Sequence, residues 1–141
     1  MSINSAKQIV PGLAFESGGE LDLQNAKALA RVQVKTADYT VLETDSGTTF
    51  TTYGDTGAII FTLPTNPKKG LNYRFIQSTD QDLTITAGTA DTLITYNNLL
   101  ADGVATSTAS HQIGAVIEVL ADGNAFHAWC TSGHTFTVVD I

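Results

Sequence analysis

The chain has 141 residues, of which 43% are hydrophobic and 15% charged, and its formal net charge is −7. This length suits one domain with its own core and leaves little room for a second. Residues 1–37 carry a net charge of +1 (4 basic minus 3 acidic), and residues 38–141 carry −8 (3 minus 11). A phosphate backbone repels such an acidic body, so we expect no nucleic-acid partner. No run of about 18 apolar residues predicts a membrane span, and no signal peptide is evident, so we expect synthesis in a cytoplasm.

Residues 1–37 are predicted to form an N-terminal arm. Pro11 and Gly12 interrupt any regular element, and Asp22 is a suitable cap for a short helix. The arm has too many apolar residues for a free solvated tail, so it either packs on its own domain or oligomer, or grips a neighbouring protein. We favour the second interpretation. The candidate contacts are its larger apolar residues: Ile9, Val10, Leu13, Phe15, Leu21 and Leu23.

Residues 38–141 are predicted to form an all-β body. Short apolar runs alternate with Gly, Asp and Asn turns, and the threonines, 21 in the whole chain, suit the exposed face of a sheet. This spacing is typical of a sandwich or barrel, and no segment after Tyr39 is long enough for a helical crossover. The first predicted strand, 31–35, lies at the end of the arm. The strands predicted in the body are 39–43, 48–53, 58–63, 71–77, 83–87, 92–96, 104–108, 113–120, 125–131 and 135–141.

The segment from Ile113 to Thr131 is predicted to be a hairpin. A two-residue turn at Asp122-Gly123 pairs Glu118 with His127 and Val116 with Trp129. One face of this hairpin carries no charge and is the predicted core: Ile113, Ala115, Ile117, Val119, Phe126, Ala128 and Cys130.

The opposite face of the hairpin mixes apolar, ionic and aromatic groups. Such a mixture suits a subunit interface, where Trp is enriched. It also suits an ordinary outer sheet face with one exposed ion pair between Glu118 and His127, and the sequence leaves both interpretations open. The subunit-interface candidates are Val116, Glu118, Leu120, His127 and Trp129.

No grouping of residues predicts catalysis, so we expect no enzyme, no catalytic residue, no cofactor and no metal. His111, His127 and His134 lack the spacing of a helical metal pair, and Cys130 is interpreted as a small buried hydrophobe. The acidic residues Asp45, Asp55, Asp80 and Asp82 are explained by turns, where Asp caps backbone amides. One enzymatic hypothesis is a small β-sandwich hydrolase, and the missing catalytic grouping is its weakness.

Several segments together resemble a recurring module of structural proteins from tailed bacteriophages, a group that includes small head-decoration (cement) proteins. The resemblance covers about residues 39–136 and does not include the arm. It implies a jelly-roll-like antiparallel β-sandwich, commonly trimeric, and it provides no catalytic residues. The segments that carry it are Tyr39–Phe50, Gly57–Pro64, Gly70–Phe75, Leu83–Ile85, Ser110–Gly114, Ala121–Asn124 and Trp129.

The resemblance and the arm together predict a capsid decoration protein. Such a protein would form a homotrimer, bind the major capsid protein on the outer surface of the virion and stabilise the shell. The alternative is a tail-fibre or receptor-recognition module that binds surface glycan, for which Tyr53, the run Tyr96-Asn97-Asn98 or Trp129 would supply the aromatic and amide groups.

Overall fold

A computed structural model describes residues 29–106, 112–131 and 137–140. The described residues form strands, short loops and one 3-10 turn, η2 (Glu43–Asp45). The all-β prediction is therefore confirmed. The strands are β1 (Arg31–Val34), β2 (Tyr39–Thr40), β3 (Thr48–Thr51), β4 (Ile59–Thr62), β5 (Asn72–Ile76), β6 (Leu83–Thr86), β7 (Leu93–Thr95), β8 (Asn98–Ala101), β9 (Gly103–Thr106), β10 (Val116–Ala121), β11 (Phe126–Cys130) and β12 (Thr137–Val139).

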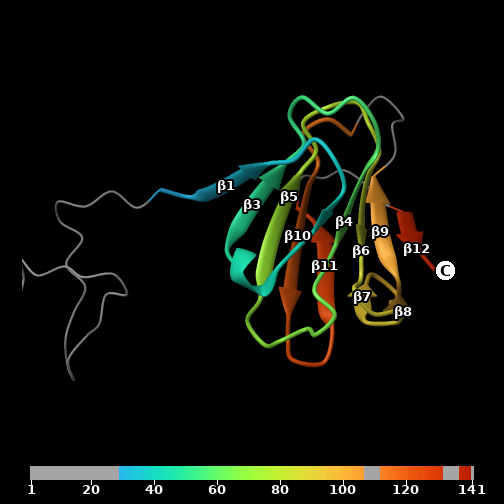
Figure 1. Cartoon of the computed structure of the whole chain (residues 1–141). Helices are drawn as coiled ribbons and strands as arrows, with labels where there is room; N and C mark the ends of the chain where they lie inside the picture. Colours follow the sequence, from blue (N-terminus) through green and yellow to red (C-terminus); the bar gives the residue numbers. More distant parts are fainter. Residues whose placement is uncertain (1–28, 107–111, 132–136, 141) are drawn as a thin grey trace, which may run out of the picture.

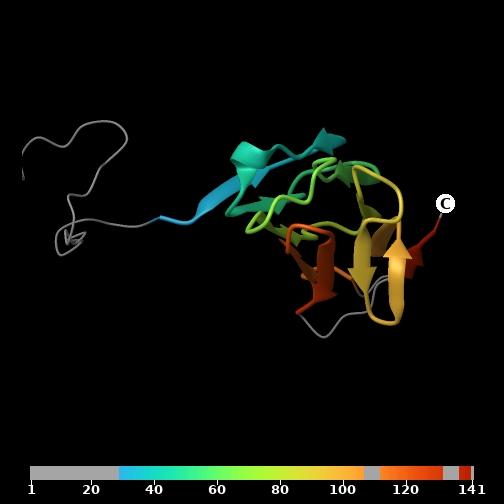
Figure 2. The same cartoon turned by 90° about the horizontal axis from the view of Figure 1, so that it is seen from below.

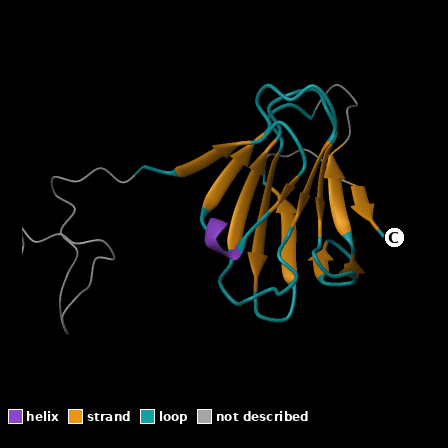
Figure 3. Cartoon of the chain, viewed as in Figure 1, coloured by secondary structure: helices purple, strands orange, loops and turns teal. Residues whose placement is uncertain are grey.

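The strands form two sheets that pack together as a sandwich. One has seven strands in the order β1-β3-β5-β10-β11-β7-β8, and the other has five in the order β12-β9-β6-β4-β2. Figures 1 and 3 show β3, β5, β10 and β11 on the left of the body and β6, β9 and β12 on the right. The core lies between these layers.

The expectation of an antiparallel jelly roll is wrong in its strand directions, because both sheets are mixed. Five of the ten strand pairings are parallel. From β1 to β6 the chain alternates between the sheets, so that β1, β3 and β5 lie parallel in one sheet and β2, β4 and β6 in the other. Parallel neighbours need a long connection, and here the strand in the opposite sheet provides it without a helix.

The centre of the core is a cluster of aromatic rings. Phe50 and Phe75 stack with their centroids 5.4 Å apart, and Phe61 of the opposite sheet lies 4.9 Å from Phe75. All three side chains are fully buried, and Tyr39 closes the cluster at 5.6 Å from Phe50. Rings at these separations add about 0.5–1.5 kcal/mol per pair to the gain from burying their area.

The predicted hairpin exists, but its register differs by two residues. Glu118 pairs with Trp129, and Leu120 pairs with His127. The two-residue turn is Gly123-Asn124, because the Asp122 carboxylate accepts hydrogen bonds from the amides of Asn124 and Ala125 at 2.7 and 2.9 Å. Gly123 has a φ of +103°, which suits the first central position of a type II′ turn.

An even shift leaves every side chain on its predicted face. The uncharged face is buried as predicted at Ala115, Ile117, Val119, Phe126 and Ala128, while Cys130 is half-buried. Ile113 is the exception, since its side chain is 54% exposed. The strand starts only at Val116, after a turn in which the Ala115 amide donates to Gln112 O at 2.8 Å and Gly114 has a φ of +89°.

The predicted arm divides differently in the structure. Residues 31–34 form β1, which pairs with β3 as the edge strand of the seven-stranded sheet. Leu29 and Ala30 precede it in neither helix nor strand. The rest of the predicted arm, including nearly all of the predicted helix, lies outside the described residues.

Candidate interaction surface

The outer face of the seven-stranded sheet carries all five residues predicted for a subunit interface. Strand register aligns one row of side chains across this face, and we call it the outer row: Val32, Thr49, Arg74, Glu118 and Trp129. A second row contains Asn72, Leu120 and His127. Val116 lies on the same face beside Ile76.

Three large apolar side chains on this outer face are exposed to solvent. Val32 is 54% exposed, Leu120 43% and Trp129 38%. These side chains surround the charged pair Arg74–Glu118, so the face combines apolar area with ionic groups. A buried interface centre with Trp and a paired Arg has this composition.

A groove of about 380 Å³ crosses the outer face perpendicular to the strands. Ala30 and Gly47 line one end, and Leu120 and Trp129 line the other. Its walls come from four adjacent strands, β3, β5, β10 and β11, together with Ala30 before β1 and Gly47 before β3. The structure therefore places three of the predicted interface residues, Glu118, Leu120 and Trp129, in one depression.

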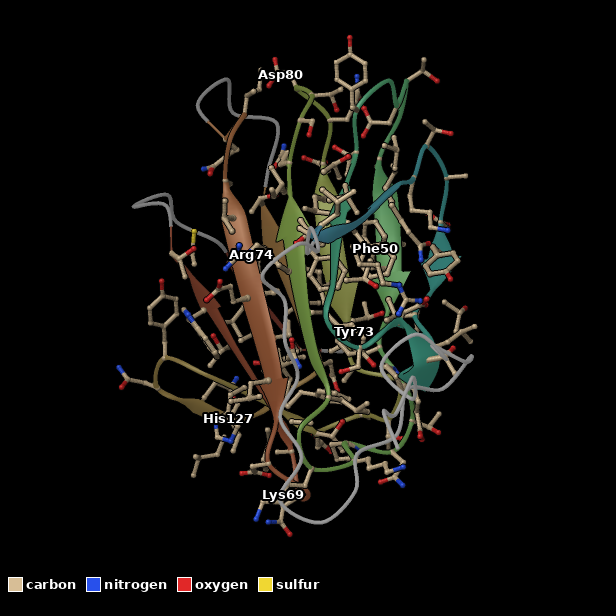
Figure 4. The ribbon with its side chains drawn as sticks, turned by 90° about the vertical axis from the view of Figure 1, so that its left-hand side faces the viewer. Phe50, Lys69, Tyr73, Arg74, Asp80 and His127 are labelled. Carbon is tan, nitrogen blue, oxygen red and sulfur yellow. The ribbon has the colours of Figure 1, made fainter. Side chains whose placement is uncertain are left out.

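The ion pairs on this face are not the predicted one. Glu118 does not pair with His127, because the two-residue register shift separates them, and it pairs instead with Arg74 on β5. Arg74 donates to Glu118 through both Nε and Nη2. Figure 4 shows Arg74 and His127 between Asp80 and Lys69, which mark the two ends of the body.

His127 pairs with the turn of its own hairpin. Its Nε2 lies 2.8 Å from Asp122 Oδ2. The hydrogen bond from His127, followed by those from the amides of Ala125 and Asn124, holds the pKa of the Asp122 carboxyl well below its usual range. The imidazole therefore reinforces the turn that sets the hairpin register.

The N-terminal strand is fixed to the body at a buried carboxylate. Asp45, which is 4% exposed, accepts a hydrogen bond from the Tyr39 hydroxyl at 2.9 Å and from the Leu42 amide at 3.0 Å. Its other oxygen lies 3.4 Å from Gln33 Nε2 and 3.6 Å from Arg31 Nη2, both on β1. Side-chain contacts to Asp45 thus join β1 to the body in addition to its pairing with β3.

The acidic residues and histidines that were considered for catalysis or metal binding are described only in part. Asp45 and Asp55 are both buried and accept hydrogen bonds, the latter from the Thr79 hydroxyl, which agrees with their interpretation as turn residues. Within residues 29–106, 112–131 and 137–140, no three His, Cys, Asp or Glu side chains gather in a way that could hold a metal ion. His111 and His134, like the six predicted arm contacts, lie outside these ranges.

One exposed apolar element was missed by sequence reasoning. β8 forms a hairpin with β7, and an irregular register between them leaves Leu99 71% and Leu100 61% exposed. Tyr96 at the turn is 67% exposed and has a φ of +46°, which is uncommon for a bulky residue. The adjacent pair Asn97-Asn98 was the available turn signal, but two consecutive leucines do not show the alternation that predicts a strand.

Comparison with known proteins adds no family. No protein-family model matches the sequence, and no curated protein is significantly similar to it. Among the described residues, no helix has the length and apolar character needed to cross a membrane. The function is therefore argued from the surface itself and from the resemblance noted above.

Proposed function

We propose that this chain is a capsid decoration (cement) protein of a tailed bacteriophage. It binds the outer head surface as an oligomer, with a homotrimer as the expected form and the major capsid protein as its partner. The observation that carries this proposal is the outer face of the seven-stranded sheet, where Val116, Glu118, Leu120, His127 and Trp129 lie together beside the entry of the N-terminal segment. Exposed apolar area of this kind favours contact with a partner.

The mechanism that we propose is thermodynamic and requires no catalysis. A protein that binds only the assembled shell stabilises it by mass action. Several arms on one oligomer raise the effective concentration of each, so weak single contacts act together. The anchoring of β1 at Asp45 supports this role, because a load on the arm then reaches a buried hydrogen-bond network.

Deletion of residues 1–20 tests the proposal directly. The truncated protein retains every described strand, so we expect a folded oligomer that no longer sediments with purified phage heads. A second variant keeps the full length and replaces Ile9, Val10, Leu13 and Phe15 with Ser, and we expect the same loss of binding. Undiminished binding by both variants would contradict the proposal, as would heads that are no more heat-resistant with the protein than without it.

The second candidate is a receptor-recognition module that binds surface glycan, and the β7–β8 turn favours it. Tyr96 presents an exposed ring beside the exposed Asn97, a combination that suits stacking and hydrogen bonding to a sugar, whereas the amide of Asn98 already donates to Asp140 at 3.0 Å. Binding on a glycan array that is lost in Tyr96→Ala and retained in Tyr53→Ala, with no affinity for heads, would support this candidate over the first.

A further inference from the structure

The groove on the outer face is long enough to hold a short extended segment. It crosses β3, β5, β10 and β11, and three inter-strand spacings amount to roughly 14 Å, the length of about four extended residues. Gly47 contributes no side chain at one end, and Leu120 and Trp129 form an apolar end opposite. A segment with two apolar side chains on one side would cover this end.

The chain that precedes β1 leaves its own body at this groove. Ala30 lines the groove, yet Leu29 is already 87% exposed. Figures 1 and 2 both show the start of β1 projecting away from the body. To enter its own groove, the chain would have to reverse at once at Leu29, whereas the start of β1 points away from the body.

We propose that residues 21–24 of a second copy of this chain occupy the groove. Leu21 and Leu23 alternate with Glu20 and Asp22, so an extended segment places both leucines on one side and both carboxylates on the other. The leucines then pack on Leu120 and Trp129. Ala30 is nine positions after Leu21, and the extended reach of roughly 30 Å over this stretch is enough to bridge two neighbouring bodies.

Charge favours an arm over direct contact between bodies. Residues 29–141 have a net charge of −6 (5 basic minus 11 acidic), whereas residues 1–28 have −1 (2 minus 3). Pressing two bodies together brings like charges close and costs electrostatic energy. A nearly neutral segment covers the same apolar residues with less repulsion.

The exchange also closes on itself. Each copy contributes one segment and one groove, so a head-to-tail arrangement leaves none unfilled when the ring closes. The inference deepens the subunit interface of the proposed function, and its oligomer rests on that proposal. Residues 9–15 remain available for the capsid, which separates the two roles along the arm.

A photo-crosslinking amino acid at position 129, in a mixture of ¹⁵N-labelled and unlabelled full-length chains, identifies the occupant. We expect crosslinked peptides that join position 129 to residues 20–28 of the other isotopic species. Crosslinks within one chain, crosslinks to residues 29–141 of a second chain, or no crosslink would each overturn the inference. The same group at the exposed Tyr53, outside the groove, is the control and should not capture residues 20–28.

The second measurement compares the oligomeric state of variants in which an Asp replaces an apolar residue. Leu120→Asp and the double change Leu21→Asp with Leu23→Asp should each convert the oligomer to monomer in analytical ultracentrifugation. Ile60→Asp is the control, because Ile60 is 42% exposed on the outside of the other sheet, against 43% for Leu120. Oligomers that survive both groove changes would overturn the inference.

The two proposals fail differently. A protein that exchanges arms but does not bind phage heads retains the inference and loses the decoration function. A protein that binds heads while remaining monomeric retains the decoration function but loses both the proposed oligomer and the inference.

Discussion

Two rows of side chains cross the same strands of the seven-stranded sheet one residue apart, and they face opposite ways. The inner row contains Phe50, Phe75 and Ile117, all fully buried. The outer row places Thr49, Arg74 and Glu118 beside them on the solvent side. Adjacent residues therefore differ in their surroundings: the inner row packs in the core and stabilises the fold, and the outer row faces solvent.

The largest difference between the rows is expected at neighbouring residues of β5. Phe75→Ala removes a ring from the centre of the aromatic cluster and should lower the free energy of unfolding by about 3–5 kcal/mol. Arg74→Ala breaks only a half-exposed ion pair with Glu118 and should cost about 1 kcal/mol or less. Urea unfolding of both variants measures the two values, and similar losses would contradict the division between the rows.

A smaller effect is expected where β1 joins the body. Asp45→Ala leaves the Tyr39 hydroxyl and the Leu42 amide without their acceptor, and we expect a loss of about 2–3 kcal/mol. Glu43→Ala is the matched control, since Glu43 makes only an exposed pair with Lys68 at 3.8 Å and should change stability by about 0.5 kcal/mol or less. Thermal unfolding checks both, and an equal response would show that β1 does not depend on Asp45.

Tyr73 tests the inner side of the sheet through pH. Burial, then the nearby Asp45 and Glu43, raises the pKa of Tyr73 to about 12 from an ordinary value of 10.0. The stability contributed by this neutral phenol is complete below pH 10 and is lost as the pH rises through about 12, because the unfolded chain ionises first.

The Tyr73→Phe variant should lose about 1 kcal/mol at neutral pH, the value of the hydrogen bond from its hydroxyl to Leu42 O at 3.0 Å. Its stability should also lack the additional decrease that ionisation of Tyr73 causes between pH 10 and 12. Unfolding curves across this range measure the difference, and parallel declines in both proteins would refute the assignment.

The smallest effect is expected at the exposed turn of the hairpin. The pKa of Asp122 is lowered from 3.8, first by the hydrogen bond from His127, so its contribution to stability is present above about pH 4 and lost as the pH falls through the lowered value. In His127→Phe the pKa should rise toward 3.8 without reaching it, because the amides of Ala125 and Asn124 still donate. An NMR titration of the Asp122 carboxyl carbon detects the change, and an unchanged midpoint would show that the imidazole has no part in it.

The sequence was most informative where periodicity and burial depend on the same residues. Alternation along residues 115–130 was enough to place Ile117, Val119 and Phe126 in the core and Trp129 outside, and the two-residue register error did not disturb this, since side chains repeat every two residues. The prediction of the partner of Glu118 depended on where the turn begins, and that prediction was wrong.

The all-β class and the two faces of the last hairpin could be predicted from the sequence, because turn residues and two-residue alternation are local properties of the chain. Tertiary contacts were needed to show that half of the strand pairings among the described residues are parallel, that Arg74 is the partner of Glu118, and that a groove starts at Ala30. Each of these depends on which distant strand lies alongside. That choice is made by packing Phe50, Phe61 and Phe75 across two sheets, and no short stretch of sequence contains it.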